Sequence, residues 1–288
     1  MSFIQSIKKI GTKINLYKLD TNVLNKQIQG TNLFSDGINL CFLDLETTGL
    51  NTDEDKIIEI AMRVVKIDKN EGNIISFDSD YTSFQDPGKP IEDKISRITG
   101  ITDSMVSGHE INREKVNEII QNADIMVAHN ARFDRSFMDR YLPLSKDKIW
   151  ACSVADIDWL ARGFVKGSLE LLSIWHGFYY ESHRAMNDVD AVIHLLTHPS
   201  YKEKKPASEL IKNAKIPYYE VIALNSHFEM KDILRIHEYK WNSESKYWWK
   251  RVKKDDIDTE RDWLTENVYD GYFMGIVEEV LLQDKYKK

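Results

Sequence analysis

The first half of the chain is dominated by short apolar runs that are separated by residues typical of turns. Residues 39–46, NLCFLDLE, form a nearly continuous apolar run, which predicts a central strand covered on both faces. Residues 56–67 and 74–84 read as two further strands, and the intervening DKNEGN has the composition of a turn. The pattern therefore predicts three strands joined by short turns.

Helical and extended patterns alternate after these strands. Strands are predicted at residues 124–129 and 148–153. Helices are predicted near residues 91–98, 113–121, 131–142, 153–161, 168–175 and 184–196. Strands that first follow one another and then alternate with helices indicate a mixed α/β sheet, here with five strands.

Both ends of the chain differ from this main domain, which we place at residues 37–200. Residues 1–36 form an extension whose isoleucines recur at helical spacing, at Ile4, Ile7, Ile10 and Ile14. We expect a short amphipathic helix there, which either packs on the body of the protein or binds a partner. The lysine-rich residues 201–216 read as a linker, or as a helix leading into a second domain.

A small α+β domain is predicted at residues 217–288. It should contain a strand at 218–224, a helix at 229–239, a hairpin at 239–252, a helix at 256–269, and a strand or helix at 273–282.

Charge and composition narrow the classes of function. The chain has 288 residues, with 39 Lys plus Arg against 46 Asp plus Glu, and a net charge of −7. This balance argues against a protein that holds nucleic acid by bulk charge alone, but it allows carboxylates that bind metal ions. No apolar run approaches the roughly 18 residues of a membrane span, and the N-terminus lacks a secretory core. We therefore expect a cytoplasmic protein without membrane contact, in which Cys41 and Cys152 are reduced thiols without a disulfide partner.

Two carboxylates mark the end of the first predicted strand. Asp44 and Glu46 are two positions apart, so on a strand they project from the same face. Burying such a pair without cations is costly, and carboxylates are the ligands that Mg²⁺ and Mn²⁺ prefer. The alternative is an exposed acidic strand end without a ligand.

Two later segments carry further polar residues. His129 and Asn130 lie where a strand turns into a helix, and Asp134 lies in the first turn of that helix. Asp134 could instead act only on the helix dipole. In the helix at 184–196, Asp188 borders an apolar stripe and should point inward, whereas Asp190 should face solvent; the stripe is Ala185, Val189, Val192 and Leu196. His183 precedes this helix, in a loop where its imidazole can move.

The order of these motifs resembles that of one enzyme family. FLDLETTGL, ITGIT, AHNARFD and HRAMND follow one another between Leu40 and Leu196. Together they are similar to the DEDDh group of 3′–5′ exonucleases, which have a ribonuclease H-like fold and include the proofreading epsilon subunit of bacterial DNA polymerase III. One departure is Asn187, which stands where an acidic residue is frequent.

This resemblance implies a mechanism and a set of roles. Two Mg²⁺ or Mn²⁺ ions would be held by Asp44, Glu46, Asp134 and Asp188, with His183 as general base. The substrate 3′ end would be contacted around Thr47, Thr48, Leu50, His129 and Asn130. The implied function is removal of nucleoside monophosphates from the 3′ ends of nucleic acid, most simply single-stranded DNA.

Two alternatives to this function stay open at the sequence level. One is a 3′–5′ exoribonuclease, because the pattern does not constrain the loops that read the 2′-OH. The other is a non-catalytic module that binds nucleic acid or recruits a polymerase or another replication or repair protein.

The hairpin of the C-terminal domain has a signal of its own. Between Tyr239 and Lys254, aromatic residues alternate with basic ones. Such interleaving suits single-stranded nucleic acid, although a small domain also needs tryptophans for its core. The candidate contact residues are Trp241, Trp248, Trp249, Lys250 and Arg251.

Overall fold

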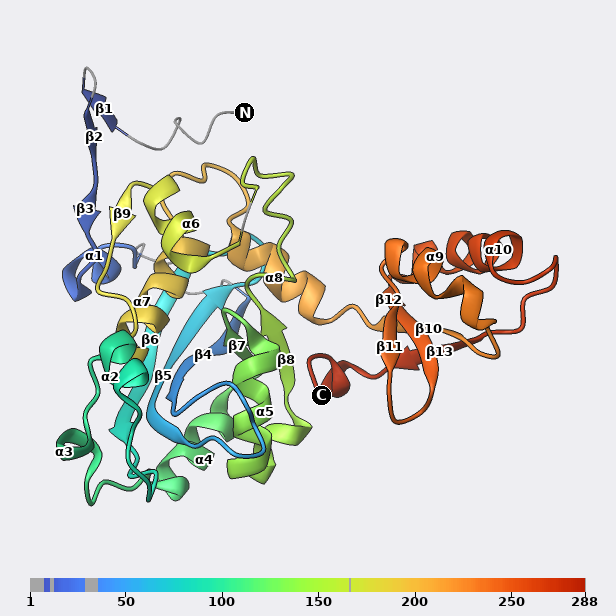
Figure 1. The fold of residues 1–288 in the computed structure, drawn as a ribbon. Coiled ribbons are helices and arrows are strands. Elements are labelled where there is room, and N and C mark those ends of the chain that lie inside the picture. The colour runs from blue at the N-terminus through green and yellow to red at the C-terminus, as the bar shows by residue number, and fades with distance from the viewer. Residues whose placement is uncertain (1–7, 11–12, 29–35, 166, 288) are drawn as a thin grey trace. The chain divides into compact units, whose positions relative to one another are not determined.

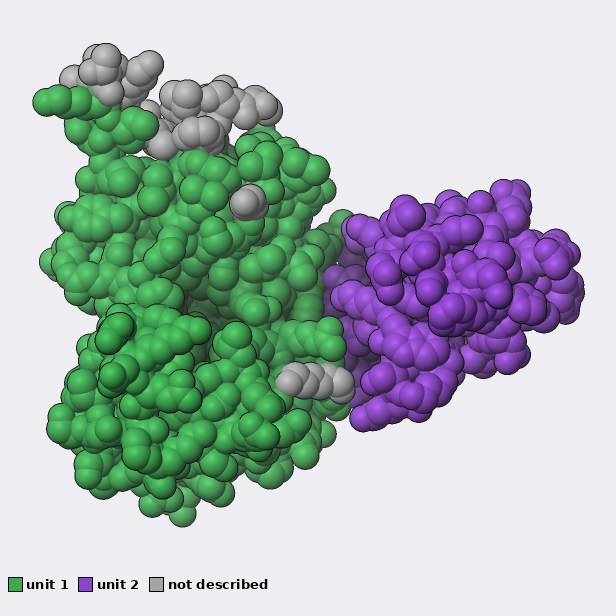
Figure 2. Space-filling view, in the orientation of Figure 1, with its two compact units in different colours: residues 1–214, 286–288 green, residues 215–285 purple. Residues whose placement is uncertain are grey.

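A computed structural model of the chain describes residues 8–10, 13–28, 36–165 and 167–287. The chain forms two compact units (Figure 2). Unit 1 comprises residues 1–214 and 286–288, and unit 2 comprises residues 215–285. None of the helices that the structure describes combines the length and apolar composition needed to cross a lipid bilayer.

Unit 1 is built on a mixed sheet of five strands, in the order β6-β5-β4-β7-β8 (Figure 1). The strands are β4 (Gly37–Thr47), β5 (Ile57–Asp68), β6 (Ile74–Phe84), β7 (Ile125–Ala128) and β8 (Ile149–Cys152). The first three pair antiparallel, while β7 pairs parallel to both β4 and β8. The predicted mixed α/β sheet is thus confirmed.

Helices cover both faces of this sheet. Leu40 and Phe42 of β4 pack in one core with α7 (Ala185–Leu196) and α8 (Pro206–Ala214). Cys41 and Leu43 pack in a second core with α4 (Arg113–Asn122) and α5 (Ala131–Tyr141). Because strand residues alternate between faces, the even-numbered positions of β4 face α7. Both cysteines are buried and free.

Short elements complete unit 1. They are α2 (Asp93–Thr99), α3 (Asp103–Val106), α6 (Leu169–Trp175), β9 (Phe178–Tyr179) and the 3₁₀ segment Pro143–Asp147. Gly100 ends α2 at a φ of 71°, a left-handed conformation that glycine adopts without strain. This glycine is the centre of the ITGIT motif.

The helix predicted near residues 153–161 is absent from the structure, which has turns there. Asp156 accepts a hydrogen bond from the Cys152 amide at 2.8 Å, and Asp158 accepts one from the Ala161 amide at 2.8 Å. Such local side-chain bonds satisfy backbone N–H groups without a helix, which explains the difference.

The N-terminal extension is also less helical than predicted. Lys8–Ile10 (β1) pairs with Lys13–Asn15 (β2), so Ile10 and Ile14 lie in strands, while Ile4 and Ile7 lie outside the described residues. β3 (Tyr17–Lys18) pairs with β9, and α1 (Thr21–Asn25) follows. β-Branched isoleucines fit extended backbone well once a partner strand is available. Leu19 and Leu24 are buried in the α7-side core, so this segment packs on unit 1.

Residues 201–216, predicted as a linker or as a helix leading into a second domain, contain the helix α8, which belongs to unit 1. Its buried residues Ala207, Leu210, Ile211 and Ala214 recur at helical spacing and pack in the α7-side core. Of the lysines that suggested a linker, four are exposed: Lys202 and Lys204 before the helix, Lys212 on it and Lys215 after it. Lys205 is buried, and its ammonium donates to the Thr197 carbonyl at 2.9 Å.

Unit 2 has a four-stranded antiparallel sheet in the order β11-β12-β10-β13. The strands are β10 (Tyr218–Ala223), β11 (Lys240–Asn242), β12 (Tyr247–Val252) and β13 (Ile276–Val280). The helices are α9 (Lys231–Ile236) and α10 (Ile257–Asn267), with 3₁₀ segments at Phe228–Met230, Lys254–Asp256 and Leu282–Asp284. Val221 on β10 packs against Leu234 of α9 and Leu264 of α10, so the helices cover one face of the sheet.

Candidate metal centre and active site

The C-terminal end of β4 presents Asp44 and Glu46 toward α7. Both positions are even-numbered, like Leu40 and Phe42, and therefore lie on the α7 side of the sheet. The pairing of β4 with β5 shifts between Glu46 and Thr47, which ends the regular strand at this point. The two carboxylates consequently lie where the strand opens into a loop.

Helix α7 brings a third carboxylate to this pair. One ligand atom each from Asp44, Glu46 and Asp188 can be chosen so that all three lie within 4.8 Å of one another. Asp188 is held by the Tyr180 hydroxyl, which donates to its Oδ1 at 3.1 Å, and by the Arg184 amide, which donates to its Oδ2 at 3.2 Å. Two distant segments thus converge on one cluster of carboxylates.

Asp134 supplies a fourth negative group beside this cluster. It is 3% exposed, in the first turn of α5, directly after β7. Its carboxylate lies outside the group of three, but its charge helps to raise the pKa of Asp44. The structure therefore brings three of the four predicted ligands together and places the fourth next to them.

Burial raises the pKa of all four carboxylates. Burial is the main cause for each. Neighbouring carboxylates add to it at Asp44, Glu46 and Asp134, whereas the hydrogen bond from Tyr180 and the charge of His183 oppose it at Asp188. The pKa of Asp44 lies well above its ordinary value, and those of Glu46, Asp134 and Asp188 rise to about 8, 7 and 6. A site in which four carboxylates cannot ionise together fits divalent cations, because their charge would offset the repulsion.

A second layer of polar residues, which was not predicted from the sequence, supports the cluster. Glu59 on β5 pairs opposite Glu46 and is 4% exposed. The Arg184 guanidinium donates to Glu59 at 3.0 Å, and the Ala185 amide donates to it at 3.1 Å, so Glu59 anchors the start of α7. A lone glutamate inside the apolar run IIEIAM was the available signal. Nothing in the pattern pointed to Tyr180.

His183 lies immediately before α7, exposed to solvent. Its φ of 63° is in the left-handed region, which is uncommon for residues other than glycine. The imidazole is close enough to Asp188 for its charge to lower the pKa of that carboxyl group. Its position at the rim of the carboxylate cluster matches the predicted loop location.

Asp190 differs from its prediction. Its side chain is 15% exposed, and it forms an ion pair with Arg63 of β5 instead of facing solvent. Arg63 is long enough to reach across the sheet face on which α7 packs, which explains the inward position.

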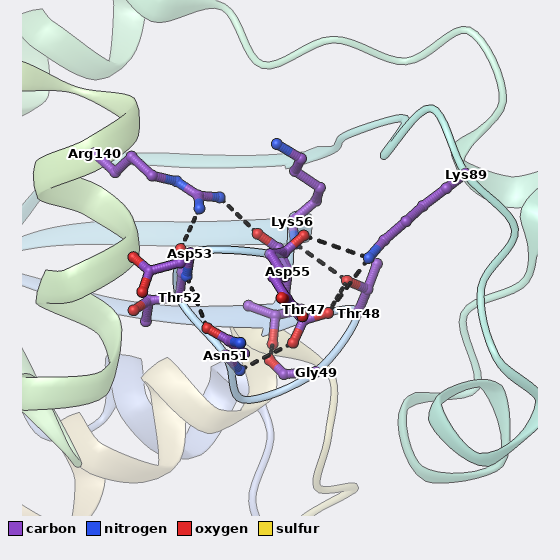
Figure 3. A network of polar contacts seen from close by, with 11 residues as sticks. Thr47, Thr48, Gly49, Asn51, Thr52, Asp53, Asp55, Lys56, Lys89 and Arg140 are labelled. Carbon is purple, nitrogen blue, oxygen red and sulfur yellow. Dashed lines mark hydrogen bonds and ion pairs between the residues drawn. The ribbon is translucent and has the colours of Figure 1, made fainter.

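The loop that follows β4 is fixed by its own polar groups (Figure 3). Thr47 Oγ1 donates to the Gly49 carbonyl at 2.6 Å, and Thr48 Oγ1 donates to Asp55 Oδ1 at 2.8 Å. Arg140 of α5 donates to the carbonyls of Thr52 and Asp55, as Figure 3 shows. These contacts give the residues predicted to cradle a substrate end a defined backbone conformation.

Loop residues differ in how far they remain available to a substrate. The Thr48 amide already donates to the Lys56 carbonyl at 2.9 Å, whereas the Leu50 side chain is 82% exposed at the tip of the loop. A Cβ at Gly49 would overlap the Asp55 carboxylate, so a larger residue there would displace the side chain that holds the loop.

His129 and Asn130 lie at the turn between β7 and α5. His129 Nδ1 is 2.7 Å from Ser153 Oγ, and burial lowers the pKa of His129 to about 4, so the imidazole is neutral at pH 7. Asn130 is exposed at the start of α5. His129 is therefore a partly buried polar group of the turn, and Asn130 is the more accessible of the two.

The five candidate contact residues of unit 2 fall into different environments. Lys250 Nζ lies 2.8 Å from Glu260, and Arg251 Nε lies 2.9 Å from Glu220. Trp248 packs against the core of unit 2, while Trp241 is 48% exposed.

Comparison with known proteins places these features in context. A family model described as "Exonuclease" matches residues 41–196. A PolC-type DNA polymerase III from Clostridium perfringens is 34% identical over 175 residues, which are 58% of this chain and 11% of the polymerase. The epsilon subunit of DNA polymerase III from Treponema pallidum is 29% identical over 187 residues, which are 60% of this chain and 82% of the subunit.

Solved structures show the same fold. A zinc-bound complex of E. coli ExoI with single-stranded DNA has a TM-score of 0.51 at 17% identity, with 75% of this chain and 63% of that chain covered. This chain thus spans only about a tenth of the PolC-type relatives it matches, but most of the Treponema subunit.

Proposed function

Because the chain belongs to the exonuclease family whose model matches residues 41–196, we propose that it is a metal-dependent 3′–5′ exonuclease. It would release nucleoside monophosphates from the 3′ end of single-stranded DNA. The observation that carries the proposal is the convergence of Asp44, Glu46 and Asp188 within 4.8 Å, beside the buried Asp134.

The residues of the site would have three roles: metal binding, proton transfer and positioning. The four carboxylates would hold two Mg²⁺ or Mn²⁺ ions, which when bound would offset phosphate charge and lower the pKa of water. His183 would accept the proton of the attacking water, since imidazole is the side chain that ordinarily titrates near neutral pH. Tyr180 would keep Asp188 oriented through its hydrogen bond to Oδ1.

The loop after β4 would receive the last nucleotide. The exposed Leu50 side chain would pack against its base. Thr47 and Thr48 at the end of β4 and Asn130 after β7 lie at the same end of the sheet, because these two strands are parallel. His129 would contribute by shaping the turn, because Ser153 already engages its Nδ1.

A labelled oligonucleotide tests the proposal directly. With Mg²⁺, a single-stranded DNA labelled at its 5′ end should be shortened to a ladder, and Asp44→Ala should abolish the ladder. Glu114→Ala, an exposed carboxylate on α4, is the matched control and should retain full activity. A wild-type chain that leaves the DNA intact with both Mg²⁺ and Mn²⁺ contradicts the proposal.

The same assay separates the remaining alternatives. RNA of matched sequence, degraded faster than DNA, would make the protein an exoribonuclease. If Mg²⁺ neither supports cleavage nor raises the melting temperature, the chain is instead a non-catalytic module, because ion binding to the native state must stabilise it. The polymerase names of the relatives lead us to propose a polymerase, or another replication or repair protein, as its partner.

A further inference from the structure

The hairpin of unit 2 carries one face that no helix of that unit covers. Val221 and Ala223 of β10 point into the core beneath α9 and α10, and they pair with Lys250 and Trp248 of β12. Because strand residues alternate, the neighbouring odd-numbered positions of β12 lie on the opposite face. This face, here called the hairpin face, consists of Lys240, Asn242, Tyr247, Trp249 and Arg251.

Trp249 lies at the centre of the hairpin face. Arg251 Cζ is 5.4 Å and Lys240 Nζ is 5.6 Å from the centre of its ring. Trp248, on the other face, packs in the core of unit 2, whereas Trp249 is not part of that core among the described residues. Core packing therefore accounts for Trp248, whereas Trp249 is partly exposed on the hairpin face.

The hairpin is strongly basic in an otherwise acidic chain. Residues 239–254 contain six Lys or Arg and one Glu, whereas the whole chain has a net charge of −7. Two of these cations have carboxylate partners, Lys250 on the helix side and Arg251 at Glu220. The other four are exposed and form no ion pair with any residue that the structure describes; they are Lys240, Lys246, Lys253 and Lys254.

We propose that the hairpin face binds single-stranded nucleic acid. This proposal rests on the proposed exonuclease function, because the hairpin face would be a second binding site for the same class of substrate. Bases would stack on Trp249 and Tyr247, and phosphates would meet the unpaired lysines. A base on Trp249 would displace the flexible Lys240 ammonium from the ring. Glu220 on β10 and Glu278 on β13 lie on the same face and repel phosphates, which confines the strand to the hairpin.

The chemistry selects single strands over duplexes. Stacking on a side chain requires a base whose own face is free, and in a duplex both faces are already stacked. Contacts to phosphate alone would show no such preference.

Binding without cleavage tests this proposal. The full chain is titrated, in EDTA, into a labelled oligothymidine of about 20 nucleotides, and fluorescence anisotropy is followed at several salt concentrations. We expect Lys240→Glu combined with Lys253→Glu to weaken binding about tenfold or more, and to reduce the salt dependence by about 0.7 for each lost phosphate contact. Trp249→Leu, which keeps an apolar side chain, should weaken binding about tenfold at every salt concentration, since stacking is a short-range term.

Arg235→Glu and Asp232→Lys provide the matched control, because they change charge on the exposed part of α9, on the helix side of the sheet. Neither should alter binding, and circular dichroism should show that every variant is folded. The proposal is overturned if Arg235→Glu weakens binding as much as Lys240→Glu combined with Lys253→Glu, or if the wild type binds duplex DNA with equal affinity.

A second assay distinguishes an error in the proposed active site from an error in the proposed hairpin site. Cleavage of a trinucleotide, which offers few bases and phosphates to a second binding site, reports on the carboxylate cluster. Asp44→Ala should abolish this cleavage and leave the binding in EDTA unchanged. The hairpin variants should weaken the binding in EDTA and leave the cleavage of the trinucleotide unchanged.

Discussion

The four carboxylates at the end of β4 make the stability of the metal-free protein depend on pH. An unfolded chain titrates its carboxyl groups near pH 4, whereas the pKa values of Glu46, Asp134 and Asp188 in the folded chain are about 8, 7 and 6. Between pH 4 and pH 8 the folded state binds more protons than the unfolded state. The contribution of these groups to the free energy of unfolding is therefore largest below about pH 4 and is lost as the pH rises toward 8.

We therefore expect the melting temperature in EDTA to fall between pH 5 and pH 8, and to fall less in Glu46→Gln. Mg²⁺ should raise the melting temperature more at pH 8 than at pH 5, because protons no longer occupy the ligands. Differential scanning calorimetry at both pH values measures this. The explanation fails if the Mg²⁺ shift is the same at both, or if wild type and Glu46→Gln respond identically to pH.

Tyr180 is a positioning residue whose role can be separated from packing. Its hydroxyl donates to Asp188 Oδ1, and hydrogen bonds to charged groups contribute about 1.5–3 kcal/mol. Tyr180→Phe keeps the ring and removes the bond, so we expect about a tenfold higher Mg²⁺ concentration at half-maximal activity. Tyr179→Phe, the exposed neighbour on β9, should behave as wild type. If Tyr180→Phe lowers the melting temperature but leaves the Mg²⁺ dependence alone, its role is only structural.

At the scale of single elements, Asp55 holds the loop between β4 and β5 in shape. Its carboxylate accepts bonds from Thr48 Oγ1 at 2.8 Å and from the Asn51 amide at 2.9 Å, and these bonds help to keep its pKa below the ordinary value although burial opposes them. The loop therefore depends on one side chain for its conformation.

Asp55→Ala should raise KM for a single-stranded oligonucleotide severalfold with a smaller effect on kcat, since the substrate end loses a fixed loop while the carboxylates stay in place. Asp55→Asn keeps an acceptor for Thr48 and should be milder. Asp53→Ala, exposed in the same loop, is the control. A loss confined to kcat would place the effect at the carboxylates instead.

The elements that could be predicted from sequence are those in which apolar residues recur with a single period, either that of a strand or that of a helix. β4, β5 and α7 have long, regular apolar patterns, and Asp44, Glu46 and Asp188 could be placed because they keep a fixed phase with those patterns. β3 depends instead on β9, a partner far away in sequence, and the turns at 153–161 combine local side-chain bonds with contacts to α8. The ion pair between Arg63 and Asp190 likewise follows from the contact between α7 and β5, which no local pattern contains.

At the scale of the whole molecule, α8 shows why the domain boundary could not be read from composition. Glu209 of α8 accepts hydrogen bonds from Arg162 at 2.6 Å and from the Asp158 amide at 2.8 Å, and Asn213 donates to the Asp156 carbonyl at 2.8 Å. The helix therefore orders the turns that follow β8. The lysines before α8 are typical of a linker, but composition does not reveal the contacts of Glu209 and Asn213 that attach this helix to unit 1.

Truncation tests this boundary. A chain that ends at residue 200 loses α8, including Leu210 and Ile211, whose burial contributes about 1.5–3 kcal/mol each. We expect it to melt at least about 10 °C below a chain that ends at residue 216, since each kcal/mol shifts the melting temperature of a domain of this size by about 2–4 °C. The chain ending at 216 also loses Tyr286, which packs in the α5-side core, so it should melt slightly below the full chain while still cleaving a trinucleotide. If the chains ending at 200 and at 216 have the same melting temperature, α8 does not stabilise unit 1. The domain boundary then lies before α8, where the lysine-rich composition predicts it.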